Sequence, residues 1–268
     1  MKLPILDLHK KEKGQKELPS QFKEAYRPDL IKRAVHALQS SARQRYGAFP
    51  DAGKRSSSET SKRRRNYRGT YGFGISRVKR KIHSRRGTRM FWVGAYTPQT
   101  VGGRRAHPPK AEKNLEKLIN VKEKRKAIRS AISATVNKEI VSLRGHKLPP
   151  NYPFIADSSL EKINQTKEMK QVLLDLGFKD ELQRSLIKKI RAGLGTMRGR
   201  KYQRKKGILV VVSEDCPAMK SLSNLSGIDV VAVTALNAEL LAPGANPGRV
   251  TIWTEKAVDK LADKKLFI

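Results

Sequence analysis

The chain has 268 residues, with 58 lysines and arginines against 24 acidic residues and a formal net charge of +34. This surplus indicates a polyanionic partner, with nucleic acid as the first choice and an anionic membrane surface as the second. The single cysteine, Cys216, excludes an internal disulfide framework and any multi-cysteine metal cluster. We expect a cytoplasmic protein, because the N-terminus lacks a signal-peptide pattern and the longest aliphatic runs are too short to span a bilayer.

The N-terminal part of the sequence predicts one strand and one helix. The apolar run LPILDL at residues 3–8 is typical of a short strand. Residues 27–43, RPDLIKRAVHALQSSAR, repeat apolar side chains at helical spacing, and Pro28 takes a first-turn position where proline is tolerated. Both elements would belong to a globular part of the protein.

Residues 43–110 form a basic segment that we do not expect to fold alone. It holds nineteen lysines and arginines against two acidic residues, a net charge of +17. Its six large aliphatic residues bury too little apolar surface to offset the entropy of ordering so long a stretch. Yet it carries eight of the 16 aromatic residues of the chain. Because bases stack on aromatic rings and guanidinium planes, we expect folded or single-stranded RNA to order this segment.

The stretch VGGRRAHPPK at residues 101–110 offers almost nothing to a hydrophobic core. Its two glycines allow a sharp turn or a close approach of the backbone to a ligand, and its two arginines can fork onto phosphates. Its two prolines stop any helix on their N-terminal side. The alternative interpretation is a surface hinge whose arginines are merely solvated.

The rest of the chain predicts an α/β layer fold. Residues 111–137 have the pattern of a long helix. From residue 152 onwards, the strand patterns YPFIAD, GILVVVS, GIDVVAV and RVTIWT alternate with the helix patterns KEMKQVLLDLGF, DELQRSLIKKI and EKAVDKLADK. Continuous aliphatic runs are typical of strands that are buried on both faces. We therefore predict a three-layer domain with a mostly parallel sheet of about four strands.

A second basic segment, residues 188–206, has nine lysines and arginines and no acidic residue. Within it, GLGTMRG at 193–199 resembles a dinucleotide-binding fingerprint, but the glycine spacing is wrong and a helix pattern precedes it. The five histidines lack metal-ligand spacing and no carboxylate pair suggests acid–base catalysis, so we expect no cofactor, no metal and no catalytic residue. An RNA-modifying enzyme with a nucleotide-binding α/β domain and a polybasic membrane-surface protein remain as alternatives.

Four stretches, in chain order, resemble ribosomal protein four of the large subunit in its archaeal and eukaryotic form: AYRPDLIKRAVHALQSSARQRYG, VGGRRAHPPKAEKNLEKLINVKEKRKAIRSAISATV, AGLGTMRGRKYQRKKGILVVVSED and LAPGANPGRVTIWTEKAV. The resemblance covers nearly the whole chain, and GGRRAHPPK and MRGRKYQRKKG are its most specific motifs. It implies a structural constituent of the large ribosomal subunit in the cytoplasm, with no enzymatic activity and no membrane partner. It also implies partners: large-subunit rRNA, neighbouring large-subunit ribosomal proteins and the nascent peptide.

The resemblance further implies a single α/β domain over residues 1–268 from which two loops reach rRNA. Loop 43–110 would penetrate the rRNA, support subunit assembly and line the peptide exit tunnel, with its tip between Arg68 and Trp92. Loop 188–206 would be a second rRNA-binding element. The expected rRNA contacts are Arg63, Arg64, Arg65, Arg68, Arg77, Lys79, Arg80, Arg85, Arg86, Arg89, Gly102, Gly103, Arg104, Arg105, His107 and Lys110 in the first loop, and Arg198, Arg200, Lys201 and Arg204 in the second. The base-stacking candidates are Tyr67, Tyr71, Phe73, Phe91 and Trp92.

Overall fold

A computed structural model describes all 268 residues of the chain, which divides into two compact units. One unit, here called the α/β unit, comprises residues 1–42 and 116–268. The other, here called the basic unit, comprises residues 43–115. Because the two are separate compact bodies, each is described by itself.

The α/β unit is built on a six-stranded sheet with the order β2-β1-β5-β10-β8-β9. The strands are β1 (Lys2–Leu6), β2 (Glu12–Glu17), β5 (Ile155–Ala156), β8 (Leu209–Val212), β9 (Asp229–Ala232) and β10 (Thr251–Thr254). Every neighbouring pair is parallel except β1 and β2, which form an antiparallel hairpin at one edge. The mostly parallel α/β sheet is confirmed, and it has six strands where the sequence predicted about four.

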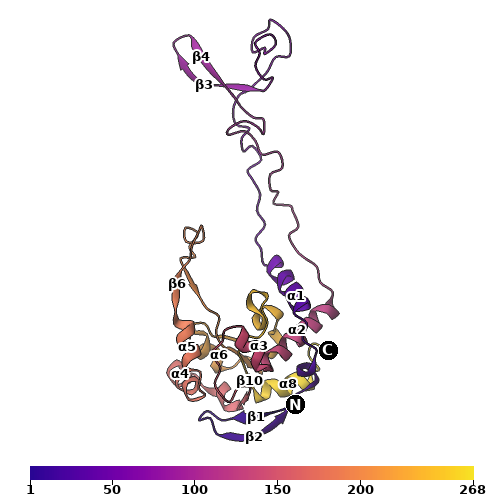
Figure 1. Ribbon diagram of the computed structural model, residues 1–268, viewed down its shortest axis with the longest axis vertical. Coiled ribbons are helices and arrows are strands. Elements are labelled where there is room, and N and C mark those ends of the chain that lie inside the picture. The colour runs from indigo at the N-terminus through magenta and orange to yellow at the C-terminus, as the bar shows by residue number, and fades with distance from the viewer. The chain divides into compact units, whose positions relative to one another are not determined.

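Helices cover both faces of this sheet, which gives three layers (Figure 1). The helices are α1 (Pro28–Ser41), α2 (Val121–Val136), α3 (Lys138–Leu143), α4 (Thr166–Asp175), α5 (Lys179–Leu186), α6 (Pro217–Ser223), α7 (Ala238–Leu241) and α8 (Glu255–Asp263), with 3-10 turns η1 (Ser20–Lys23), η2 (Ser158–Lys162), η3 (Val233–Ala235) and η4 (Pro243–Ala245). Along β8, Leu209 and Val211 pack with α1, α2, α7 and α8, whereas Val210 and Val212 pack with α3, α4, α5 and α6. The alternation of side chains along a strand thus supplies both cores from one aliphatic run.

Two helix predictions extended too far. The helix predicted over residues 111–137 begins only at Val121, because most of residues 111–120 are exposed and Leu118 is 89% exposed. The helix predicted over 180–190 ends at Leu186, and Lys188–Ile190 instead forms strand β6, which pairs antiparallel with β7 (Tyr202–Arg204). A helix without a buried stripe gains little from packing, so local propensity alone did not sustain either extension.

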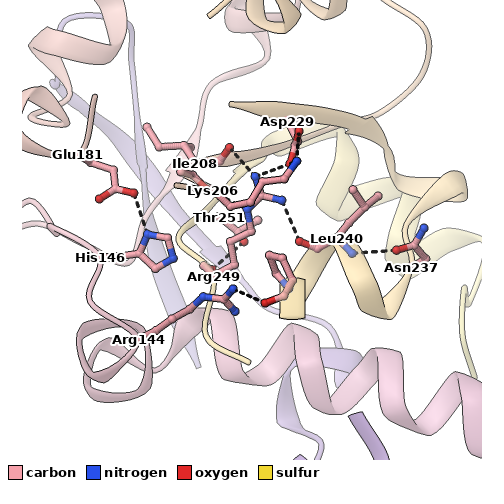
Figure 2. A network of polar contacts seen from close by, with 12 residues as sticks. Arg144, His146, Glu181, Lys206, Ile208, Asp229, Asn237, Leu240, Arg249 and Thr251 are labelled. Atoms are coloured by element: carbon pink, nitrogen blue, oxygen red, sulfur yellow. Dashed lines mark hydrogen bonds and ion pairs between the residues drawn. The ribbon is translucent and has the colours of Figure 1, made fainter. Parts of the chain in front are cut away.

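Arg249, two residues before β10, is fully buried and connects three parts of the α/β unit (Figure 2). Its Nε donates to the Gly207 carbonyl at 2.8 Å and its Nη1 to the Leu240 carbonyl at 3.0 Å. Its Nη2 contacts the Asp229 carboxylate at 2.6 Å and the Ile208 carbonyl at 3.3 Å. A guanidinium can be buried at low cost only when its donors are satisfied in this way.

The basic unit contains one regular element, the antiparallel hairpin of β3 (Arg80–Arg86) and β4 (Arg89–Gly94). Thr70 and Ala95 are the buried residues of this unit. Its backbone follows mainly turns and extended stretches, which agrees with its small number of aliphatic side chains.

Candidate nucleic-acid interface

The β3–β4 hairpin presents three of the predicted arginines at its turn. Arg86 and Arg89 are cross-strand partners, and Gly87 and Thr88 form the two-residue turn between them. Gly87 has φ 59°, which fits a type II′ turn with glycine at its first central position. Arg85 donates through Nε to the Gly87 carbonyl at 2.8 Å. The turn therefore holds Arg85, Arg86 and Arg89 close together and exposed to solvent.

Arg68 joins two predicted stacking residues that are 25 positions apart in the sequence. Its guanidinium carbon lies 5.4 Å from the Tyr67 ring centroid and 5.4 Å from that of Trp92. These residues, together with Phe73, line a pocket of about 500 Å³. Tyr67 and Phe73 remain 71% and 72% exposed, so much of their surface is open to a ligand. The arrangement offers flat aromatic surface beside a cation, which suits unpaired bases.

The other stacking candidates each lie beside a predicted arginine. Arg77 lies 4.6 Å from the Tyr71 ring centroid, and Arg89 lies 5.2 Å from that of Phe91. Three further aromatic residues outside the named stacking candidates have the same surroundings. Phe49 lies 4.6 Å from Arg55, Tyr96 contacts both Lys79 and Arg104, and Tyr202 of β7 lies 3.5 Å from the Lys188 ammonium. The signal was present in the sequence, since each of them belongs to one of the two basic segments.

The VGGRRAHPPK stretch begins with a tight turn. The N–H of Gly103 donates to the Thr100 carbonyl at 3.0 Å, and the N–H of Arg104 donates to that of Tyr96 at 3.2 Å. A Cβ at position 103 would lie 2.0 Å from the Thr97 carbonyl oxygen. Gly103 is therefore required by the turn itself, whereas the surroundings of Gly102, with φ 71°, are open.

The second half of this stretch pairs with the beginning of the basic unit. The N–H of Ala48 donates to the Pro109 carbonyl at 3.0 Å, and a Cβ on Gly47 would lie 2.8 Å from the Ala111 nitrogen. We call this pairing the base of the basic unit. Next to it, Arg105, His107 and Lys110 line a cleft of about 930 Å³ together with other residues of the unit. Of the other predicted cations, Arg63, Arg64 and Arg65 lie exposed in a bend and turn, and Arg80 at the start of β3 donates to the Ser76 carbonyl at 2.7 Å.

The second basic segment also folds as a hairpin, within the α/β unit. Strands β6 and β7 pair from Lys188 with Arg204 to Ile190 with Tyr202, and the predicted contacts Arg198, Arg200, Lys201 and Arg204 are all exposed. Gly193 and Gly199 have φ 81° and 74° in the connecting turns. The GLGTMRG stretch thus closes an antiparallel hairpin, and no helix follows it. This geometry is not that of a dinucleotide-binding turn, which joins a parallel strand to a helix.

Two further observations limit the function. None of the helices is long and apolar enough to cross a membrane. Burial is the main cause that raises the pKa of the Cys216 thiol, so this side chain is protonated and weakly nucleophilic at neutral pH.

Comparison with known proteins identifies the family of the chain. The profile of the family described as "Ribosomal protein L4/L1 family" matches residues 16–264. A large ribosomal subunit protein uL4 from Nanoarchaeum equitans is 48% identical over 268 residues, which cover 100% of both chains. Proteins of the same name from Archaeoglobus fulgidus and Methanococcoides burtonii are 44% and 43% identical, and the matches cover 98% and 96% of this chain and 99% and 96% of theirs.

Proposed function

Because the chain belongs to the ribosomal protein L4/L1 family, we propose that it binds large-subunit rRNA through the basic unit and the β6–β7 hairpin. It is a structural protein of the large ribosomal subunit in the cytoplasm and not an enzyme. The observation that carries the proposal is the repeated pairing of exposed aromatic rings with arginine or lysine in both basic segments.

The binding mechanism follows from charge and stacking. Arginines and lysines that meet phosphates release condensed counterions, so rRNA affinity falls steeply as salt rises. If about ten cations engage phosphates, the slope of log affinity against log salt is roughly −7 to −9. Unpaired bases stack on Tyr67, Phe73 and Trp92, next to the guanidinium of Arg68.

The basic unit buries few of its own side chains, and this leaves them available for contacts with rRNA. With Thr70 and Ala95 as its buried residues, it gains little stability from its own packing, and contacts with rRNA supply the rest. We propose that it reaches into the rRNA during subunit assembly and lines the peptide exit tunnel near residues 68–92, beside the nascent peptide. Neighbouring ribosomal proteins are the expected partners of the α/β unit.

A charge reversal in the VGGRRAHPPK stretch tests the proposal. Replacing Arg104 and Arg105 by glutamate should weaken binding to deproteinised large-subunit rRNA and make the salt slope shallower by about 2. The matched control replaces the exposed Lys167 and Lys170 of α4 by glutamate, which changes the net charge equally. Filter binding over a range of salt concentrations measures both. Equal losses in the two variants would refute a specific role for the basic unit, and unchanged affinity for Arg104→Glu/Arg105→Glu would reduce this stretch to a solvated hinge.

A further inference from the structure

The α/β unit contains a third basic cluster that belongs to neither predicted loop alone. It surrounds a pocket of about 610 Å³ between the end of α3, helix α5, the β6–β7 hairpin and η4. The cationic residues that line it are Arg144, Arg184, Lys189, Arg204, Lys205 and Lys206. His146 lines it as well, and no acidic side chain is among the lining residues. Such a concentration of positive charge around a concave surface favours an anion.

Two buried nitrogens of residues that line this pocket have no partner in the protein. His146 Nε2 and Arg144 Nη1 are both shielded from solvent and make no hydrogen bond. The side chain of His146 as a whole is only 3% exposed. The other nitrogens of these two groups are engaged: His146 Nδ1 lies 2.7 Å from Glu181 Oε1, and Arg144 Nη2 donates to the Pro243 carbonyl at 2.7 Å. Figure 2 shows the imidazole between Glu181 and Arg144. Buried polar atoms are nearly always hydrogen-bonded, so two orphans at one pocket indicate a ligand.

Glu181 and Arg184 contact the imidazole at Nδ1, which leaves Nε2 as the ring nitrogen without a partner. Burial opposes ionisation of Glu181, but hydrogen bonds from Arg184 and His146 outweigh it and lower the pKa of this carboxyl to about 2. Glu181 is therefore a carboxylate that can accept a proton from His146 Nδ1 at 2.7 Å. Arg184 Nη2 lies 3.0 Å from the same nitrogen, but its two hydrogens are taken by Glu181 Oε1 and the Lys206 carbonyl. The proton between the ring and Glu181 therefore belongs to Nδ1. Nε2 then donates only when the ring is doubly protonated. An anion at Nε2 would favour that state.

We propose that this pocket binds a phosphate group, with His146 Nε2 and Arg144 Nη1 as its buried donors and the surrounding lysines and arginines as its charged rim. On the proposed function, on which this step rests, the group is a backbone phosphodiester of rRNA. The β6–β7 hairpin supports this choice, because Lys189 and Arg204 belong both to the hairpin and to the wall of the pocket. An RNA strand that meets the hairpin can thus place one phosphate in the pocket without leaving the same surface.

Binding in this pocket is coupled to protonation. Burial lowers the pKa of His146, Glu181 opposes this effect, and Arg184 and Arg144 add to it. The other charged groups that face the ring are Lys189 on β6, Arg204 on β7 and the adjacent Lys205 and Lys206, all cationic. The empty pocket therefore keeps His146 neutral, and a bound anion raises its pKa. Because the bound state has the higher pKa, affinity is greatest at low pH and declines as pH rises through that value.

The unmodified full chain provides the first test. The probe is dimethyl phosphate, a diester with one negative charge throughout the range from about pH 5.5 to about pH 8, and inorganic phosphate serves as the comparison for a free phosphate ion. NMR titration of the histidine rings should show the pKa of His146 rising by about one unit or more with the probe, while the exposed His36 does not respond. If inorganic phosphate alone produces the shift, the site takes a free phosphate ion and the assignment to the RNA backbone is overturned. If neither probe produces it, the pocket is not a phosphate site.

The second test uses deproteinised large-subunit rRNA. His146→Asn keeps a nitrogen that can face Glu181 and removes the one that faces the pocket, and His36→Asn is the matched control. His146→Asn should bind rRNA roughly tenfold more weakly near pH 6 and should lose the pH dependence of the unmodified protein. Normal rRNA binding with identical pH profiles for both variants overturns the pocket and leaves the proposed function intact. Weak, salt-insensitive rRNA binding by the unmodified protein overturns the proposed function itself. The NMR test on the unmodified chain still decides the pocket if His146→Asn does not fold.

Discussion

The buried guanidinium of Arg249 should contribute more to the stability of the α/β unit than any exposed arginine. Replacing it by methionine keeps most of the side-chain volume but removes four hydrogen bonds and the ion pair with Asp229. The change therefore tests polar satisfaction and not cavity formation.

The magnitude follows from the groups left behind. Without the guanidinium, the buried Gly207 carbonyl and the partly buried Leu240 carbonyl each lose a hydrogen-bond donor. Leaving a fully buried polar group without a partner costs about 1–3 kcal/mol of stability. The Ile208 carbonyl still accepts from the Asp229 N–H, and Asp229 keeps its contact with Lys206 at 2.9 Å. We therefore expect a loss of about 3–5 kcal/mol, as for other broken buried ion pairs.

Urea unfolding of the full chain measures this loss. Trp253 is 3% exposed and packs edge-on against Phe22 at 5.0 Å, so its fluorescence reports the core. A Trp92→Phe background removes the only other tryptophan. Arg198→Met is the control, because Arg198 lies exposed in the hairpin turn and its loss should cost less than about 0.5 kcal/mol.

A loss below about 1 kcal/mol for Arg249→Met, with an unchanged denaturant slope, would refute the reasoning. It would mean that water or a backbone shift satisfies the carbonyls as well as the guanidinium does.

Three further outcomes are expected. Deleting residues 60–95 should leave the calorimetric transition of the α/β unit largely intact, because that stretch contributes nothing to its sheet; loss of the transition would contradict the division into two units. Glu181→Gln should lower the free energy of unfolding at neutral pH by about 2–3 kcal/mol and flatten its pH dependence. The pKa of this carboxyl is lowered to about 2 in the folded state, so the group stabilises the fold above its unfolded-state pKa of about 4 and loses that effect as pH falls towards about 2. An acid titration by circular dichroism that is the same for the variant and the unmodified protein would contradict this. Gly103→Ala should weaken rRNA binding in filter assays without moving the thermal transition, because a methyl group there would lie 2.0 Å from a carbonyl oxygen of the turn; unaltered binding would show that the turn is not needed.

The sequence predicted the central sheet well because its aliphatic runs are unambiguous. Leu209 to Val212 are all buried, as a continuous apolar run requires of a strand covered on both faces. The edge strand β2, EKGQKE, was missed because its side chains are polar and mostly exposed, so only pairing with β1 makes it a strand. The stretch after Leu186 was predicted to continue the helix but pairs with β7 as a strand. Its sequence pattern alone did not distinguish a helix from a hairpin.

The sequence was sufficient to locate the candidate interface but not to show which of its residues lie together. Charge density and aromatic content were sufficient to select the two basic segments. The pairing of Arg68 with Trp92 depends on a turn and a hairpin that bring distant residues together, and no local pattern reveals it. The pocket around His146 was missed for the same reason, because Arg144 and His146 follow α3 whereas Arg184 lies on α5, and each is unremarkable in its own stretch of sequence.

Because of the pairing at the base of the basic unit, the way in which this unit is closed does not depend on how many residues it contains. A backbone hydrogen bond joins Ala48 and Pro109, so the two ends of the segment between these residues are held close together. Lengthening a closed loop costs only about 0.6 kcal/mol for each doubling of its length. Insertions or deletions between these two residues are therefore cheap for the chain, and relatives can differ in reach without any change in the fold that carries them.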